Sequence, residues 1–211
     1  MTTSLWADTR TFFPIFLEAL KRRPDIESVL VVGAADGKFV LPLAEAGYRV
    51  TAIDVNASAL FGKQGVPSGQ VEEKYPGSEN GLEHRIHARQ LTSRVSIIHG
   101  DICDEKIPPH DALWTSCSWH YSLNHFRPLG SFIEALKQCV RPGGYFGAEY
   151  FMPVSMSHVD SEHYLEQGAI WNHLNDWKAT WEAYTPPFIE LPHVGQPESH
   201  IHRMGFVLAS R

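Results

Sequence analysis

Residues 28–56 contain, in immediate succession, an apolar strand, a tight turn, a helix and a second apolar strand. The segment reads SVLVVGAADGKFVLPLAEAGYRVTAIDVN. Its first apolar run ends at Gly33, the turn reaches Gly37, and the second strand ends on Asp54. Small residues in such a turn let a ligand approach the backbone, and the helix that follows presents free N–H groups at its N-terminus. The chain is therefore expected to build an α/β sheet with a ligand site at this turn.

The acid at the end of the second strand indicates what kind of ligand binds there. Asp54 follows Gly33 at about the 20-residue spacing found where a carboxylate meets a ribose diol. A carboxylate can accept hydrogen bonds from both hydroxyl groups of such a diol. The turn and the acid together predict a cofactor that contains adenosine.

The pattern required of a dinucleotide site is incomplete. A G-x-G-x-x-G turn would need glycine at three positions where this chain has Gly33, Ala35 and Lys38. The Tyr-x-x-x-Lys pair of a short-chain dehydrogenase is also absent from the sequence. An NAD-binding or non-catalytic Rossmann-like protein therefore stays only as an alternative.

The turn resembles the first motif of class I methyltransferases that depend on S-adenosylmethionine (SAM). Three later features occur in the order that this family has them. VSIIHG leads into Asp101 and Ile102, Asp111 opens the strand ALWTSC, and a helix over 129–140 precedes RPGG and the strand YFGAEYF. The resemblance covers residues 25–152, and the order of these features is more specific than a glycine turn alone.

The resemblance implies SAM as the cofactor and residues that hold it. Two departures concern the methionine half of SAM. The family often has an acid where this chain has Val31, and Ala35 replaces its middle glycine. The cofactor-binding residues that the resemblance implies are Gly33, Ala34, Ala35, Asp36, Gly37, Asp54, Val55, Asp101, Ile102 and Ser116.

The length of the chain predicts one domain over residues 1–211. Within it we expect an N-terminal arm and helix over 1–24, an inserted loop over 62–81 that acts as a lid or else is disordered, and a cap over 153–176. The net charge of −6 gives no electrostatic reason to expect nucleic acid as a partner. The sequence leaves the oligomeric state open.

Cysteine usage and hydropathy bear on where the protein resides. The three cysteines have no paired spacing, which favours a reducing compartment. The N-terminus lacks a signal-peptide pattern, and no apolar run approaches the roughly 18 residues of a membrane span. A cytoplasmic location and no membrane partner are expected.

Apolar periodicity predicts the remaining elements and hence the fold class. The expectation is an α/β, Rossmann-like, doubly wound and mostly parallel seven-stranded sheet with a C-terminal antiparallel hairpin. The predicted helices cover 11–22, 37–46, 56–61, 82–92, 129–140 and a stretch near 161–175. The predicted strands include 27–33, 49–54, 94–99 and a closing pair drawn from 177–194 and 200–211.

Ligands of such sheets bind beyond the carboxyl ends of the strands, which singles out the run SCSWHY after the fourth strand. We predict that His120 acts as a general base or orients the acceptor. Trp119 or Tyr121 would wall the methyl site, because an aromatic face attracts a sulfonium cation. Filling space beneath a loop is the alternative role for these side chains.

Further residues are expected to contact the acceptor. Glu149 would bind an amine or else hydrogen-bond a neighbouring backbone group, and Cys117 is more often a buried filler than a nucleophile. The predicted substrate-binding residues are Trp6, Arg10, Cys117, Glu149, Tyr150 and His202.

No metal site is expected from the sequence. His200 and His202 lie two residues apart and so face one side of a strand, and His120 and His125 could join them. No H-x-E-x-x-H or C-x-x-C spacing accompanies them, and the chain has 12 histidines, so chance clusters are common.

These patterns favour a SAM-dependent methyltransferase that acts on nitrogen or oxygen of a small organic acceptor in specialised metabolism. The alternative is an enzyme that consumes SAM without methylation, such as a cyclase that forms azetidine-2-carboxylate and releases methylthioadenosine. The altered turn and the aromatic residues would suit a refolded SAM conformation in that case.

Overall fold

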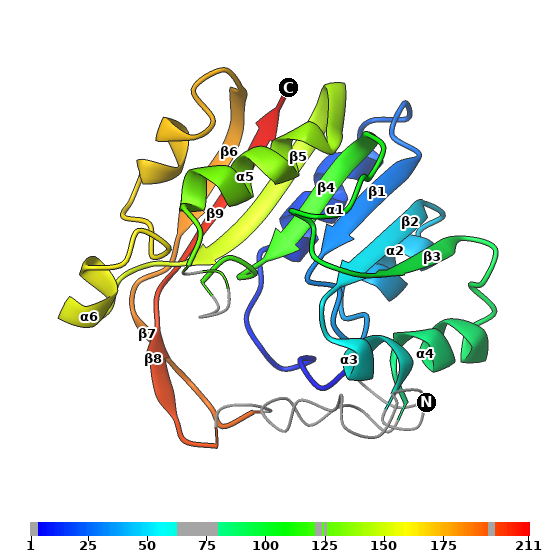
Figure 1. Cartoon of the computed structure of the whole chain (residues 1–211), viewed down its shortest axis with the longest axis horizontal. Helices are drawn as coiled ribbons and strands as arrows, with labels where there is room; N and C mark the ends of the chain where they lie inside the picture. Colours follow the sequence, from blue (N-terminus) through cyan, green and yellow to red (C-terminus); the bar gives the residue numbers. More distant parts are fainter. Residues whose placement is uncertain (1–3, 63–79, 121–123, 125, 194–196) are drawn as a thin grey trace.

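A seven-stranded sheet forms the centre of this computed structural model, which describes residues 4–62, 80–120, 124, 126–193 and 197–211. The strand order is β3-β2-β1-β4-β5-β9-β6 (Figure 1). The first five strands are parallel to one another, and β9 runs antiparallel to both of its neighbours, β5 and β6. The strands are β1 (Ser28–Val32), β2 (Arg49–Asp54), β3 (Val95–His99), β4 (His110–Ser116), β5 (Val140–Phe151), β6 (Lys178–Tyr184), β7 (Phe188–Glu190), β8 (His200–His202) and β9 (Met204–Ser210). The predicted fold class is confirmed.

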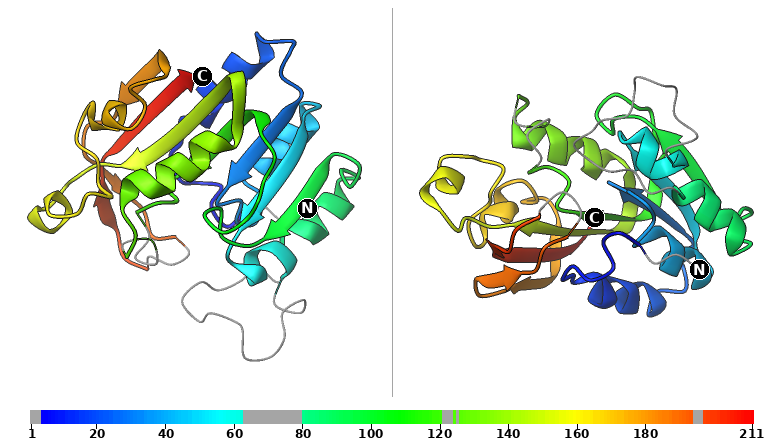
Figure 2. Two further views of the ribbon diagram at one scale, coloured as in Figure 1. Left: turned by 45° about the horizontal axis from the view of Figure 1, so that its top comes forward. Right: turned by 90° about the horizontal axis from the view of Figure 1, so that it is seen from below.

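Short helices connect the parallel strands and cover both faces of the sheet. The helices are α1 (Phe13–Lys21), α2 (Val40–Glu45), α3 (Ala57–Phe61), α4 (Leu82–Ala88), α5 (Leu129–Gln138), α6 (Met156–Val159) and the 3₁₀ helix η3 (Ala169–Asn172). Figure 2 shows α5 on one face of the sheet and α1 on the other. None of the helices in this described part of the chain is long and apolar enough to cross a membrane.

Two apolar cores form because successive strand residues point to opposite faces. On β1, Val29 and Val31 face α1 and α2, whereas Leu30 and Val32 face α5. Both faces of a central parallel strand are covered, so it is apolar throughout, and four of its five residues are buried.

Local signals mark the starts of α1 and α3. Pro14 lies in the first turn of α1, where its missing N–H costs little. The Asn56 side chain accepts a hydrogen bond from the backbone N–H of Ala59 and caps α3, as the sequence indicates.

The predicted helix near 161–175 is wrong. That stretch contains only η3, after Gly168 in the left-handed conformation at φ +79°. Leu165, Ile170 and Leu174 are buried in the α5 core, so their spacing reflects packing of an irregular segment rather than a continuous helix.

The C-terminal segment divides into two pairings. Strand β9 enters the main sheet between β5 and β6, antiparallel to both. Strand β8 instead pairs with β7 in a separate two-stranded sheet, with Glu190 opposite His200. Figure 1 shows β7 and β8 below the carboxyl end of the main sheet, which is the edge where ligands bind.

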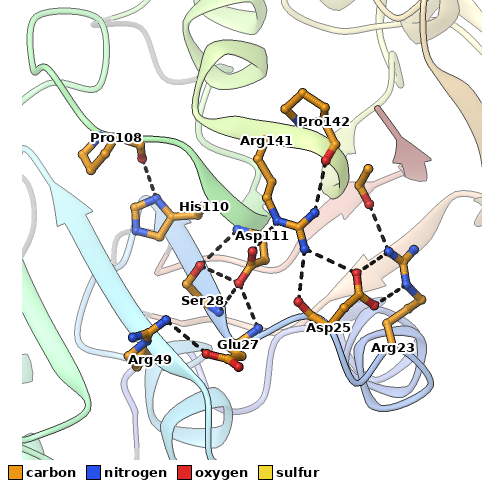
Figure 3. A network of polar contacts seen from close by, with 11 residues as sticks. Arg23, Asp25, Glu27, Ser28, Arg49, Pro108, His110, Asp111, Arg141 and Pro142 are labelled. Atoms are coloured by element: carbon orange, nitrogen blue, oxygen red, sulfur yellow. Dashed lines mark hydrogen bonds and ion pairs between the residues drawn. The ribbon is translucent and has the colours of Figure 1, made fainter.

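Asp111 fastens the opposite, amino end of the sheet (Figure 3). It accepts hydrogen bonds from the backbone of Glu27 and Ser28 at 2.9 and 2.8 Å and from the Arg141 guanidinium. Burial acts to raise the pKa of Asp111, but these hydrogen bonds outweigh it and lower that pKa to about 2.

We therefore expect Asp111→Asn to lower the free energy of unfolding by about 2 kcal/mol at pH 7. The folded-state pKa lies below the unfolded value of 3.8, so the carboxylate stabilises the fold above about pH 5. This contribution is lost progressively as the pH falls towards 2. Urea unfolding at several pH values measures it, with the exposed Asp104→Asn as the control. A difference between variant and wild type that stays constant from pH 7 to pH 3 would contradict this account.

Candidate active site

The turn after β1 has an unusual backbone. Gly33, Ala35 and Gly37 have φ angles of +74°, +45° and +95°, so alternate residues are left-handed. Alanine in this conformation is disfavoured by about 1–2 kcal/mol relative to its ordinary conformation. The turn keeps its shape although its middle residue is not glycine, because a neighbouring carboxylate holds it.

That carboxylate belongs to Asp54, at the end of β2. Its Oδ2 accepts the backbone N–H of Ala35 at 2.7 Å, and its Oδ1 accepts that of Asn56 at 2.8 Å. Burial raises the pKa of Asp54, against the lowering effect of these hydrogen bonds. A carboxylate has about four acceptor positions, so Asp54 can still accept from a ligand's hydroxyl groups.

The ends of the neighbouring strands contribute an acid and two apolar residues. Asp101 follows β3, and its carboxylate accepts hydrogen bonds from both terminal nitrogens of Arg127, at 3.1 and 2.9 Å. Burial acts to raise the pKa of Asp101, but the Arg127 hydrogen bonds outweigh it and lower that pKa. Beside this pair, Ile102 is buried and Val55 is exposed. Asp101, Ile102 and Val55, three of the implied cofactor-binding residues, thus follow the ends of β2 and β3.

The N-terminal arm, residues 4–12, is fastened to the glycine turn. Asp36 is buried and accepts the Ser4 hydroxyl at 2.6 Å and the Leu5 backbone N–H at 2.7 Å. Arg85 of α4 forms an ion pair with the same carboxylate at 2.9 Å. Arg85 also donates to the Asp36 backbone carbonyl at 2.6 Å, so both the side chain and the carbonyl of Asp36 are engaged within the protein.

A second acid, Glu149 on β5, holds the other end of the arm. Its carboxylate accepts the Thr11 hydroxyl at 2.8 and 2.9 Å, the Phe12 backbone N–H at 2.7 Å and the Ser116 hydroxyl at 2.5 Å. Glu149 is only 1% exposed, and burial raises its pKa. Of the two roles predicted for Glu149, these contacts correspond to the second, in which its carboxylate accepts hydrogen bonds from neighbouring groups of the protein.

Lys38 fixes the middle of the arm. Its Nζ donates to the Thr9 carbonyl at 2.8 Å and lies 2.6 Å from the Thr9 hydroxyl. Burial lowers the pKa of Lys38, and Glu149 partly offsets this effect. In Figure 1 the arm, in dark blue, runs below the carboxyl ends of the parallel strands. The arm therefore covers the predicted cofactor turn.

Two of the aromatic residues predicted at the reacting site pack inside the protein. Trp119 and Tyr150 are fully buried and stack with ring centroids 5.7 Å apart, so both pack the core in this conformation. Tyr121 lies outside the described residues, as does His125. The assignment of Trp119, Tyr121 and Tyr150 to the reacting site stays a prediction.

Cys117 is buried against Phe188 and Met204 and has a left-handed φ of +50°. Burial raises the pKa of its thiol well above the usual range, which keeps the sulfur protonated. A protonated thiol is a poor nucleophile, and this favours a packing role for Cys117.

Five rings form an aromatic cluster at the end of β5. His202 stacks on Phe151 with centroids 3.9 Å apart, and His120 meets the edge of Phe151 at 4.4 Å. His158 stacks on Tyr164 at 4.1 Å, and Tyr164 lies 6.0 Å from His120. The structure thus brings together two residues that the sequence places far apart, His120 and His202.

The arm contributes two more predicted residues near this cluster. The Arg10 guanidinium lies over the Phe188 ring at 4.4 Å, and the Trp6 ring lies 5.4 Å from that of His193. The predicted lid lies almost wholly outside the described residues, which resume at Asn80. The acceptor side of the site is therefore described by the arm, the end of β5 and the β7–β8 pair.

Sequence reasoning missed several residues that build this site. Arg127, Arg85 and Thr11 each bind a predicted site acid, but they lie 26, 49 and 138 residues from it. No local pattern marks such pairs. Lys38 carries a weak signal, as the cation directly beside the glycine turn.

A sequence model for the family described as "Methyltransferase domain" matches residues 30–148 of this chain. The match begins in β1 and ends in β5, so it contains the glycine turn, Asp54 and Asp101. No curated protein sequence matches the chain.

Solved structures show the same fold at low sequence identity. TehB from Haemophilus influenzae matches with a TM-score of 0.68 and 16% identity, covering 97% of this chain; the chain spans only 64% of TehB. YcgJ from Bacillus subtilis gives 0.64 and 12% identity, with 94% and 97% of the two chains covered. The 1,6-didemethyltoxoflavin-N1-methyltransferase from Burkholderia thailandensis gives 0.61 and 18% identity, with 98% and 80% covered.

Proposed function

This chain belongs to the methyltransferase family, and from that membership we propose that it transfers a methyl group from SAM to a nitrogen or oxygen atom of a small organic acceptor. The observation that carries the proposal is the left-handed turn of Gly33, Ala35 and Gly37 held by Asp54. A role in specialised metabolism, a single domain over 1–211 and a cytoplasmic location are parts of the same proposal.

The residues at the turn fit SAM. A β-carbon added at Gly33 would meet only the Ser118 β-carbon, at 3.4 Å, so the backbone there is open to close approach. Asp54 has acceptor positions left for a ribose diol, while Ile102 and Val55 offer apolar contact to an adenine. The backbone from Gly33 to Gly37 would hold the methionine part.

The protein's task in this reaction is mainly to position the reactants. SAM supplies an electrophilic methyl group on a sulfonium, and in-line placement of the nucleophile can contribute about 7–11 kcal/mol. Asp36, Lys38 and Glu149 fasten the arm beside the turn, where it would limit the access of water. The aromatic cluster offers ring faces to a flat or cationic acceptor.

The chemistry of a related fold supports a small acceptor. The Burkholderia enzyme was solved with 1,6-didemethyltoxoflavin and S-adenosylhomocysteine bound, and it is an N1-methyltransferase. This chain's net charge of −6 gives no electrostatic reason to expect nucleic acid as a partner.

His120 is the proposed general base or orienting group. We expect His120→Ala to lower kcat by about 100-fold or more, since general-base catalysis contributes about 10²–10⁴-fold. His120→Gln, which keeps a hydrogen-bonding side chain, should recover more turnover if His120 only orients the acceptor. The exposed His84→Ala serves as the control. Unchanged turnover in His120→Ala would show that His120 is not the general base.

The acceptor class is tested by a screen with methyl-labelled SAM. Small amines, phenols and carboxylates, a mixed tRNA and an unfolded protein are each incubated with the enzyme, and label is followed into each class. Label in a small nitrogen or oxygen compound supports the proposal. Label only in RNA or protein would contradict it.

A further inference from the structure

Three histidines and a glutamate converge at the two-stranded β7–β8 sheet. We name Glu190, His193, His200 and His202 the histidine–glutamate cluster. One oxygen of Glu190 lies 3.1 Å from Nε2 of His202 and 3.5 Å from Nε2 of both His193 and His200. All four side chains are largely covered, with exposed fractions of only 12–18%.

Strand geometry makes this convergence possible. Glu190 pairs directly with His200, and His202 lies two residues further on the same strand, so all three share one face. The opposite face carries Ile189 and Ile201, which are 69% and 55% exposed. The pair thus presents apolar side chains outward and its titratable side chains inward, the reverse of what ordinary solvation of charges would favour.

The separations match the coordination shell of a small cation. Nitrogen and oxygen ligands that bind zinc tetrahedrally at about 2.0–2.1 Å lie about 3.3–3.4 Å from one another. The three separations from the Glu190 oxygen, 3.1, 3.5 and 3.5 Å, bracket that value. One ligand atom from each of the four residues lies within 4.8 Å of all the others. A small inward shift of these side chains would therefore give all four ligands the separations of a tetrahedral zinc site.

Hydrogen bonding explains the cluster less well than a cation does. Two of the three nitrogen–oxygen separations, at 3.5 Å, exceed the usual 2.7–3.2 Å. Nδ1 of His200 lies 2.9 Å from the Glu198 carbonyl, which can only accept, so this nitrogen carries the proton. In the neutral ring, Nε2 of His200 then points a lone pair at the carboxylate.

Nε2 of His200 is buried and has no hydrogen-bond partner within the described ranges. A lone pair aimed at a carboxylate oxygen is unfavourable unless a cation lies between them. Donation by the second ring nitrogen to a carbonyl is the usual arrangement of a metal-binding histidine, because it fixes the tautomer and orients the ring.

We propose that the histidine–glutamate cluster binds one divalent transition-metal ion, with Zn²⁺ as the ion that its ligands fit best. Imidazole nitrogen and carboxylate oxygen both suit zinc. Four protein ligands fill a tetrahedral shell, so the ion is structural. It pins β7 and β8 to the segment that bears His193, beside Trp6 of the arm and Phe151 of β5.

The sequence contains this ligand set as E-x-x-H at 190–193 and H-x-H at 200–202. Neither is an H-x-E-x-x-H or a C-x-x-C spacing, which is why no metal was expected from the sequence. The pairing of β7 with β8 is what brings the two halves together.

The test uses tag-free full-length protein, stripped with a chelator and titrated with Zn²⁺ or Co²⁺. We expect about one equivalent of Zn²⁺ to bind and Co²⁺ to give the visible absorption of tetrahedral nitrogen and oxygen coordination. His200→Ala/His202→Ala should weaken Zn²⁺ binding by more than about 100-fold, since even outer contacts of a metal site contribute about 10–100-fold. The matched control is His84→Ala/His87→Ala, which removes two exposed histidines from α4.

Glu190→Gln is the second variant, because it keeps the side-chain shape if the double variant fails to fold. It should weaken Zn²⁺ binding by at least about tenfold. Wild-type protein that binds no Zn²⁺, or cluster variants that bind it as tightly as wild type, would overturn the proposal. Metal binding is measured without SAM, so its failure is distinguishable from failure of the proposed methyl transfer.

Discussion

Asp54→Asn is expected to bind SAM at least about tenfold more weakly than wild type, because it replaces a charged acceptor of the ribose diol by a neutral amide. Hydrogen bonds to a charged group contribute about 1.5–3 kcal/mol, and a factor of ten corresponds to about 1.4 kcal/mol. The amide also turns a donor towards the backbone N–H of Ala35 or Asn56, which Asp54 now accepts. The left-handed turn would therefore loosen as well.

Calorimetric titration with SAM and with S-adenosylhomocysteine measures this loss. Asp104→Asn is the matched control, because Asp104 is exposed and lies on the same edge, three residues after Asp101. Circular dichroism and thermal unfolding show whether the variant keeps its fold. Equal affinity in Asp54→Asn and wild type would show that Asp54 does not contact the cofactor.

The second large effect is expected for Glu149→Ala. Removal of this carboxylate leaves the Thr11 and Ser116 hydroxyls and the Phe12 backbone N–H without their acceptor. Each buried polar group left unsatisfied costs about 1–3 kcal/mol, so we expect the free energy of unfolding to fall by about 3–5 kcal/mol. For a chain of this size, that corresponds to a melting temperature lower by about 10 °C.

The loss should extend to function, because Glu149 anchors the arm. We expect limited proteolysis to cut near Thr11 in the variant but not in wild type, and KM for the acceptor to rise. Glu166→Ala is the control, since Glu166 is exposed. An arm that stays protected in Glu149→Ala would show that Asp36 and Lys38 are sufficient to hold it.

The parallel half of the fold was predictable because its signals are local. The apolar run of β1, the cap at Asn56 and the acid Asp54 each lie within a short stretch whose physics is decided by neighbours in sequence. The same holds for α5, whose apolar face is periodic and buried. The end of β2 and the start of α3 followed from these signals.

The acceptor side was less predictable because contacts between distant segments decide it. The stretch near 161–175 is irregular apart from η3, because packing of Leu165, Ile170 and Leu174 in the α5 core and the left-handed Gly168 override local preference. Glu149 and Thr11, or Glu190 and His202, meet only after the sheet has formed. Sequence alone does not encode such partners in any spacing rule.

The most direct test of methyl transfer is incubation of purified protein with SAM alone, followed by mass spectrometry of the small molecules. The proposed function predicts that SAM stays intact until an acceptor is added, and that S-adenosylhomocysteine then forms with the methylated product. Methylthioadenosine that accumulates without any acceptor would contradict it and identify an enzyme that cyclises or cleaves SAM itself.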